Sequence, residues 1–119
     1  MKKSSREKGT EFEQKAVSYL RRQGYRILEK NFYSRYGEID LVAMDGRYLC
    51  FIEVKYRETT GKGDPLEAVD LRKQRRICKT ALFYLIRKGY PDTTACRFDV
   101  IGITPEKIEL IKNAFPYRP

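Results

Sequence analysis

The fold is decided by residues 37–57, which read GEIDLVAMDGRYLCFIEVKYR. Two runs rich in apolar and β-branched residues, 38–44 and 48–57, flank the dipeptide Asp45-Gly46, which is typical of a tight hairpin turn. These runs predict two antiparallel strands. Alternate residues of a strand share one face, and on each strand that face is apolar near the turn and charged away from it. The charged ends therefore meet at one place on the sheet.

The register of this hairpin decides which carboxylates meet. With Asp45-Gly46 as the two turn residues, Glu38 lies opposite Glu53, and Asp40 lies diagonal to Glu53. A shift of two residues sets Asp40 directly opposite Glu53 instead. In either register the carboxylates converge at the charged end of one sheet face.

The flanking segments predict two helices and three further strands. Helical spacing of apolar residues predicts a first helix over residues 7–22, and the imperfect alternation of residues 25–33 suits a strand at a sheet edge. Asp64-Pro65-Leu66-Glu67 has the pattern of a helix N-terminus with Asp64 as N-cap, and the long helix should end near Lys88-Gly89. Residues 94–103 and 107–111 predict the last strands. This order is that of an α/β fold, a mixed sheet flanked by helices.

Length and charge limit the class of protein. The 119 residues suit one domain, 1–119, with 1–8 and 113–119 expected as loosely ordered tails. The 25 Lys and Arg against 16 Asp and Glu give a net charge of +9. This excess favours polyanionic partners, nucleic acid ahead of an anionic membrane surface, although a basic composition is equally typical of a merely soluble protein. No apolar run reaches the ~20 residues of a membrane span, and residues 1–8 lack a secretory signal. We therefore expect a cytoplasmic location and no membrane partner.

Cysteine and histidine usage excludes several chemistries. The sequence contains no histidine and three well separated cysteines, Cys50, Cys78 and Cys96. The spacing of the three cysteines is not that of a zinc site, and no histidine is present to complete one. We expect the cysteines to be reduced, mostly buried thiols. Without histidine, Ser-His and Cys-His catalysis is ruled out. Any catalysis must use carboxylates, lysine, tyrosine or a metal.

The converging carboxylates indicate a metal site. Clustered carboxylates raise one another's pKa unless a cation is present. Asp40 and Glu53, together with the main-chain carbonyl of Val54, offer the hard oxygen ligands that Mg²⁺ or Mn²⁺ prefers, and such a metal activates water and neutralises charge on a phosphate. Lys55 is placed to orient that water or to stabilise the transition state. Glu13 borders the buried stripe of the first helix, so the metal, Lys55 or a metal-bound water is its expected partner.

The same charges have a plainer interpretation. Glu38, Glu53 and Lys55 are also consistent with cross-strand ion pairs on a solvated face. The apolar neighbours of Asp40 and the apolar lead-in to Glu53 favour the metal site, because an exposed ion-pair ladder does not need them.

Several basic and aromatic residues are candidates for nucleic-acid contact. Lys73 lies on the inner line of the long helix, where it contacts phosphate or else pairs with Asp70 or Asp99. Arg97 and Asp99 share a strand face and are interpreted as a structural ion pair. A glycine loop carries Lys62, and aromatic and basic residues alternate beside the expected site. The candidates are Arg35, Tyr36, Arg57, Lys62 and Lys73.

The paired motifs resemble a known family. Residues 37–43 and 51–57, with Arg97-Phe98-Asp99-Val100 as the later strand, resemble the signature of the uncharacterised YraN-like bacterial family. The resemblance runs from the first helix to about Ile103. That family is similar to archaeal Holliday-junction resolvases and to the wider restriction-endonuclease-like, PD-(D/E)xK nucleases. Phe12 stands where the family usually has glycine, and Ile39 replaces the proline of the wider motif.

The resemblance implies a fold, a site and a reaction. The fold is a three-layer α-β-α core in the order α-β-β-β-α-β. The site is Mg²⁺-dependent, with catalytic roles for Glu13, Asp40, Glu53 and Lys55. The reaction is endonucleolytic cleavage of DNA, including branched or structured DNA, and a homodimer would suit symmetric cutting of a junction. Fold analogy alone does not establish a reaction. A non-catalytic nucleic-acid-binding protein, a structural partner-binding domain, and RNA in place of DNA stay open.

Overall fold

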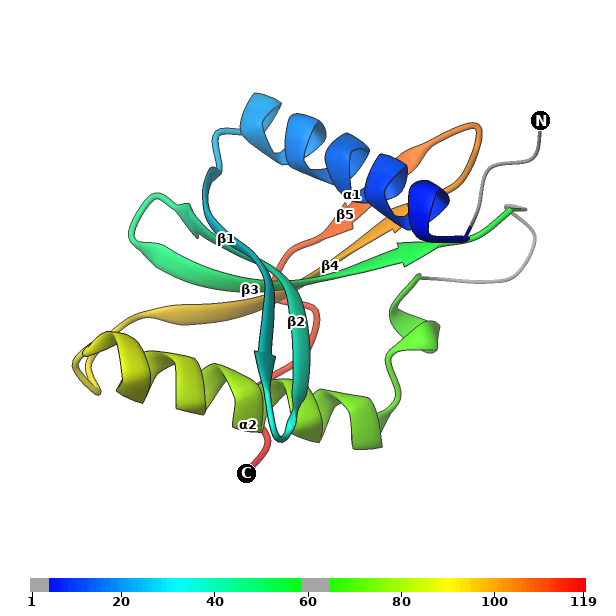
Figure 1. Ribbon diagram of the computed structural model, residues 1–119. Coiled ribbons are helices and arrows are strands. Elements are labelled where there is room, and N and C mark those ends of the chain that lie inside the picture. Colours follow the sequence, from blue (N-terminus) through cyan, green and yellow to red (C-terminus); the bar gives the residue numbers. More distant parts are fainter. Residues whose placement is uncertain (1–4, 59–64) are drawn as a thin grey trace.

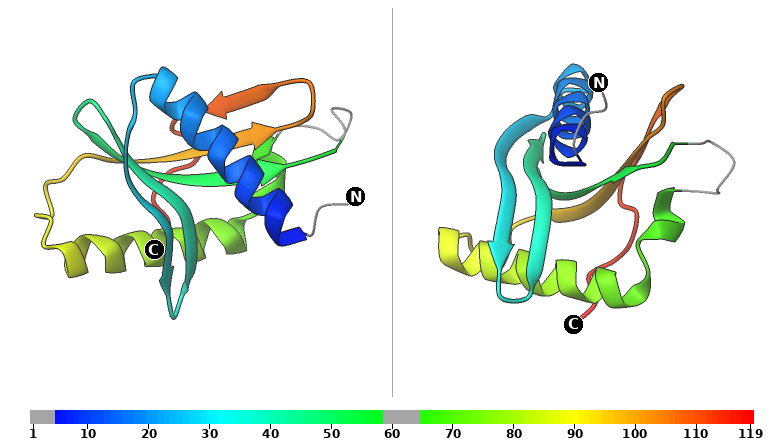
Figure 2. Two further views of the ribbon diagram at one scale, coloured as in Figure 1. Left: turned by 45° about the horizontal axis from the view of Figure 1, so that its top comes forward. Right: turned by 45° about the vertical axis from the view of Figure 1, so that its right-hand side comes forward.

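The computed structural model describes residues 5–58 and 65–119 and shows a five-stranded sheet between two helices (Figure 1). The strand order is β1-β2-β3-β4-β5. Helix α1 (Ser5–Arg22) covers one face and α2 (Leu71–Lys88) covers the other, as the views of Figure 2 agree. The strands are β1 (Arg26–Ser34), β2 (Gly37–Asp45), β3 (Tyr48–Tyr56), β4 (Cys96–Ile103) and β5 (Ile108–Ile111). The predicted α-β-β-β-α-β core and the mixed α/β class are confirmed.

The sheet contains both antiparallel and parallel strand pairs, because a helix lies between β3 and β4 in the chain. β1, β2 and β3 pair antiparallel, as do β4 and β5, whereas β3 and β4 pair parallel. A parallel pair needs a long crossover connection, and the segment containing α2 supplies it. β1 lies at the edge, with a register shift between Ile27 and Glu29 that accounts for its imperfect alternation.

Each face of the sheet carries its own apolar core. Val42 and Phe51 pack in the cluster that also includes Ile77, Ala81 and other residues of α2. The neighbouring strand residues Leu41 and Ile52 point the other way, into the cluster that includes residues of α1. Among the described residues, no helix is both long and apolar enough to cross a membrane.

The hairpin turn corrects the first register. Asp45 pairs with Tyr48, so the turn residues are Gly46-Arg47 and not Asp45-Gly46. Gly46 has φ 58°, the positive value that the first turn residue of a type II′ hairpin requires. Asp45 stays in β2, where its carboxylate is 2.7 Å from Nη2 of Arg97. The structure therefore has the second register, and its last pair, Leu41 with Ile52, comes just before Asp40 and Glu53.

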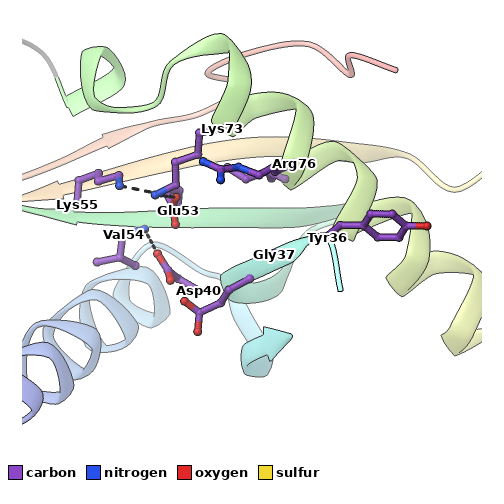
Figure 3. A pocket seen from close by; sticks show the side chains of 10 residues that line it. Tyr36, Gly37, Asp40, Glu53, Val54, Lys55, Lys73 and Arg76 are labelled. Atoms are coloured by element: carbon purple, nitrogen blue, oxygen red, sulfur yellow. Dashed lines mark hydrogen bonds and ion pairs between the residues drawn. The ribbon is translucent and has the colours of Figure 1, made fainter. Parts of the chain in front are cut away.

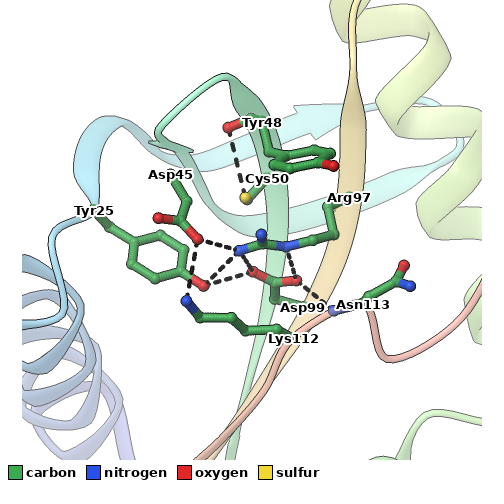
Figure 4. Close-up of polar contacts among 8 residues, drawn as sticks. All are labelled: Tyr25, Asp45, Tyr48, Cys50, Arg97, Asp99, Lys112 and Asn113. Atoms are coloured by element: carbon green, nitrogen blue, oxygen red, sulfur yellow. Dashed lines mark hydrogen bonds and ion pairs between the residues drawn. The ribbon is translucent and has the colours of Figure 1, made fainter.

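Arg97 is the centre of a polar cluster at the turn end of the sheet (Figure 4). Its Nε lies 2.9 Å from Oδ1 of the buried Asp99, which confirms the predicted ion pair. The hydroxyl of Tyr25 donates to Asp99 Oδ2 and accepts from Arg97 Nη2, both at 2.8 Å. This charge is buried with partners and is part of the framework, remote from the Asp40 end of β2.

The long helix begins later than predicted. Residues Pro65–Ala68 form a 3₁₀ helix, η1, and α2 starts only after Asp70, whose carboxylate accepts from Lys73 N at 2.9 Å. The expected N-cap Asp64 lies outside the described residues. A Cβ on Gly102 of β4 would overlap the Pro65 ring, so this proline packs tightly on β4 and the chain turns before α2. The helix end is as predicted, because Gly89 adopts a left-handed conformation at the C-cap.

Residues 5–8 and 113–119 are better ordered than predicted. Helix α1 already begins at Ser5, and residues 1–4 lie outside the described part. The C-terminal segment docks on the α2 side: the ring of Phe115 is 5% exposed and stacks on Phe98 at 5.1 Å between centroids. Nε of Arg118 donates to Oε1 of Gln74 at 2.7 Å. The prediction of a loosely ordered 113–119 tail is wrong, because an apolar ring in this tail completes the core.

Candidate active site

The candidate site lies where β2 and β3 separate. Their pairing ends at Leu41 and Ile52, and the next residues, Asp40 and Glu53, border a cavity of about 350 Å³ next to α2 (Figure 3). A strand pair that diverges leaves main-chain groups and side chains facing open space instead of a ladder. The cavity is lined by Tyr36, Gly37, Glu38, Asp40, Glu53, Val54, Lys55, Lys73, Arg76 and Ile77.

Asp40 takes the place of the missing ladder partner. Its Oδ2 accepts a hydrogen bond from Val54 N at 2.8 Å. Leu49 N and Arg57 N, at odd-numbered positions of this segment, donate to carbonyls of the β4 side, so the amide and carbonyl of Val54 point toward β2. The Val54 carbonyl therefore faces the same gap as the Asp40 carboxylate.

The two carboxyl groups behave as a coupled pair. Burial, together with hydrogen bonding and repulsion from Glu53, raises the pKa of Asp40 to about 9. Burial also acts to raise the pKa of Glu53, but hydrogen bonding with Asp40 and the ammonium of Lys73 outweigh it and hold that pKa below its usual value. In the absence of a cation the pair therefore keeps one proton near neutral pH.

Two lysines reach the pair from different elements. Nζ of Lys73 on α2 lies 2.7 Å from Oε2 of Glu53, and Nζ of Lys55 lies 3.9 Å from the same oxygen. Burial and the neighbouring Lys73 lower the pKa of Lys55, although Glu53 opposes this shift. The alternative pairings of the Lys73 ammonium with Asp70 or Asp99 are wrong, since it points into the cavity.

The donor set fits a hard divalent cation. Oε2 of Glu53 is buried, and the Lys73 ammonium lies 2.7 Å from it. In the part of the chain that the structure describes, no group of three or more Asp, Glu, Cys or His could hold a metal. Asp40, Glu53 and the Val54 carbonyl would thus be the protein ligands, and Mg²⁺ commonly binds through one or two carboxylates while keeping several waters.

Glu13 lies outside this cavity. It borders a second cavity of about 500 Å³, beside α1, which shares Asp40 and Val54 with the first. Both carboxylate oxygens of Glu13 accept from Nδ2 of Asn31 at 3.0 Å. The neighbouring Phe12 stacks on Tyr56 with centroids 3.6 Å apart, which gives the large side chain at this position a packing role. The Glu13 carboxylate thus has a partner other than Lys55.

The candidate residues for nucleic-acid contact lie at different positions relative to the first cavity. Tyr36 lines the first cavity, and Nη2 of the exposed Arg35 donates to its hydroxyl at 2.9 Å. Arg57 follows β3 and is half-buried, while Lys62 lies outside the described residues. The sequence reasoning missed Arg76, which lines the first cavity, and Asn31. Arg76 follows Lys73 by three residues, a helical spacing that puts both on one side of α2. Asn31 is a poor strand former within a predicted strand, and this mismatch is the feature of the sequence that could have marked it as a candidate site residue.

These features define an α/β protein whose carboxylate–lysine site lies where two sheet strands separate. The chain belongs to the uncharacterised protein family UPF0102, whose model matches residues 12–103. It is 52% identical to a UPF0102 protein of Lachnoclostridium phytofermentans over 87% of each chain. It is 50% identical to one of Persephonella marina, over 91% of this chain and 92% of that one. A relative from Geobacter sulfurreducens is 52% identical, over 90% and 87% respectively.

The family membership confirms the resemblance that the paired motifs indicated, and the match includes both cavities' central residues, Asp40 and Val54. The wider restriction-endonuclease-like relationship stays a prediction.

Proposed function

We propose that this protein is a metal-dependent nuclease that hydrolyses phosphodiester bonds of DNA. The observation that carries the proposal is the pair formed by the half-buried Asp40 and the buried Glu53, with two ammonium groups within 3.9 Å of one Glu53 oxygen. Two neighbouring carboxyl groups that are partly withdrawn from water are costly unless they do chemistry or bind a cation.

Each residue of the first cavity has a distinct part in this proposal. Asp40, Glu53 and the Val54 carbonyl hold Mg²⁺ or Mn²⁺, which when bound supplies an activated water and neutralises charge on the phosphate. Lys55 stands beside them to stabilise negative charge that develops on the phosphate oxygens. Lys73 and Arg76 line the same cavity from α2 and bind further phosphate oxygens.

The surface of α2 extends this cationic wall. Its first half carries basic side chains that are exposed and form no ion pair with any residue the structure describes. Uncompensated cations in a row favour a polyanionic backbone, because binding releases its condensed counterions. These side chains are Arg72, Arg75, Arg76 and Lys79.

The test is cleavage of labelled linear, single-stranded and four-way-junction DNA with Mg²⁺ or Mn²⁺. Asp40→Asn and Glu53→Gln should abolish metal-dependent cleavage, while the amide of Asn can still accept from Val54 N and the fold is retained by circular dichroism. Asp92→Asn, at an exposed position in the loop after α2, is the matched control and should cleave like the wild type. Cleavage that survives in Asp40→Asn would overturn the proposal.

A second candidate is a non-catalytic nucleic-acid-binding protein. The observation that favours it is Lys73 itself, whose ammonium already neutralises Glu53 at 2.7 Å, so the site can be satisfied without a metal. Salt-sensitive binding to DNA or RNA without cleavage under any metal condition would support this candidate.

The predicted homodimer, which would suit symmetric cutting of a junction, has its own test. Sedimentation at working concentrations measures whether the protein is a monomer or a dimer.

A further inference from the structure

Two cavities meet at the candidate metal ligands. Asp40 and Val54, which Figure 3 shows in the first cavity, beside α2, also line the second, beside α1. A group bound in the second cavity would therefore adjoin the phosphate that reacts in the first. The second cavity, of about 500 Å³, is lined by Gly9, Thr10, Phe12, Glu13, Asn31, Tyr33, Asp40, Val54 and Tyr56.

The two cavities differ in chemistry. The first contains three cationic side chains, whereas no Lys or Arg is among the described residues that line the second. The second instead contains three aromatic rings. Phe12 and Tyr56 are stacked on each other, and the ring of Tyr33 is 68% exposed while its hydroxyl is hydrogen-bonded with Glu38. A cavity with aromatic walls and no cation suits the base of a nucleotide and not its phosphate.

The polar part of the second cavity is fixed in place. Asn31 lies between the Lys30–Leu41 and Phe32–Ile39 pairs, so it stands across from Asp40 on the neighbouring strand. It has φ 53°, a left-handed conformation that asparagine tolerates, and both oxygens of Glu13 hold its amide. A carboxylate and an amide carbonyl at the edge of an aromatic cavity match a ligand with a π face and a polar edge.

We propose that the second cavity binds an unpaired nucleobase next to the scissile phosphate. This inference rests on the proposed nuclease function and names its substrate class: nucleic acid with bases outside the double-helical stack, as in single strands, flaps and branch points. A base inside a duplex has both faces covered by its neighbours and cannot reach such a cavity without being flipped out. Tyr33 supplies the stacking surface, and the Glu13–Asn31 pair contacts the polar edge of the base.

The experiment compares affinities for a fluorescein-labelled single strand and for the fully paired duplex of the same sequence, with Ca²⁺ in place of Mg²⁺. Tyr33→Ala should weaken binding of the single strand on the order of 5- to 150-fold, the effect of losing one base-stacking contact, and should leave duplex binding unchanged. Tyr33→Phe keeps the ring and should bind like the wild type. Tyr117→Ala, also an exposed tyrosine but remote from this cavity, is the matched control and should change neither affinity.

The possible results separate this inference from the function on which it rests. Equal weakening of both probes, or of neither, by Tyr33→Ala would overturn the base site. Metal-dependent cleavage that is lost in Asp40→Asn but unaffected by Tyr33→Ala would leave the nuclease standing without it. Single-strand binding that depends on Tyr33, with no cleavage at all, would support the base site and refute the nuclease.

Discussion

Removal of the Lys73 ammonium tests how the carboxylate pair is held in the absence of a metal. In Lys73→Met, Glu53 loses its partner at 2.7 Å and keeps only Lys55, at 3.9 Å. Breaking a fully buried ion pair costs about 3–5 kcal/mol, and an exposed pair is worth about 0–1 kcal/mol. The side chain of Glu53 is 6% exposed and that of Lys73 is 32% exposed, so this pair lies between the limits. We expect a loss of about 2 kcal/mol, or about 8 °C in Tm for a chain of this size.

The assay is thermal unfolding in EDTA at low salt, as a double-mutant cycle with Glu53→Gln. The coupling energy between the two positions should be about 1–2 kcal/mol, because most of the cost is the charge left on Glu53. Lys79→Met, at an exposed lysine of the same helix that has no ion pair with residues 5–58 or 65–119, is the matched control and should change Tm little.

The same variants test the position of the cation. Mg²⁺ should stabilise Lys73→Met more than the wild type, since a cation at Glu53 replaces the missing ammonium. A coupling energy below about 0.5 kcal/mol would refute the ion-pair reasoning. Equal stabilisation of both proteins by Mg²⁺ would refute the placement of the metal at Glu53.

Two further predictions concern the pH dependence of stability and the packing of η1. Burial and Glu53 raise the pKa of Asp40 from 3.8 to about 9, so its contribution to stability is complete below the lower value and is lost as the pH rises through the higher one. Denaturant unfolding in EDTA should thus show wild-type stability falling between pH 5 and 9 more steeply than that of Asp40→Asn, and parallel curves would contradict the shift. Gly102→Ala should cost about 1–3 kcal/mol because its Cβ would meet Pro65. Gly9→Ala, in α1 with nothing within 4 Å of its Cβ, should instead gain about 0.5–1 kcal/mol, and a similar loss at both sites would argue against the contact.

The carboxylate site was largely predictable because its members are close in sequence and lie on regular strands. Asp40 and Glu53 belong to one hairpin, and strand periodicity puts each on a known face. The choice between two registers was not predictable from the turn dipeptide. It depends on Asp45, which remains paired in β2 and does not join the turn. Its carboxylate lies 2.7 Å from Nη2 of Arg97, which belongs to β4, much later in the chain.

The start of α2 shows how a correct local pattern is overruled. The residues 64–67 have the signature of a helix N-terminus, and Asp70 has the same capping chemistry six residues later. Local propensity differs little between such caps. The close contact of Pro65 with Gly102 holds η1 against β4, so α2 begins only after the later cap residue, Asp70.

The sequence by itself determined the elements, the mixed α/β class and the carboxylates that meet, because hydrophobic periodicity, turn residues and caps act over a few neighbouring residues. Only the tertiary structure decided the partners: Lys73 with Glu53, Asn31 with Glu13, and the docking of Phe115 on Phe98. A chain with 25 basic and 16 acidic residues offers many pairings of similar intrinsic energy. Distance and burial select among them, and both arise only when segments far apart in the sequence pack together.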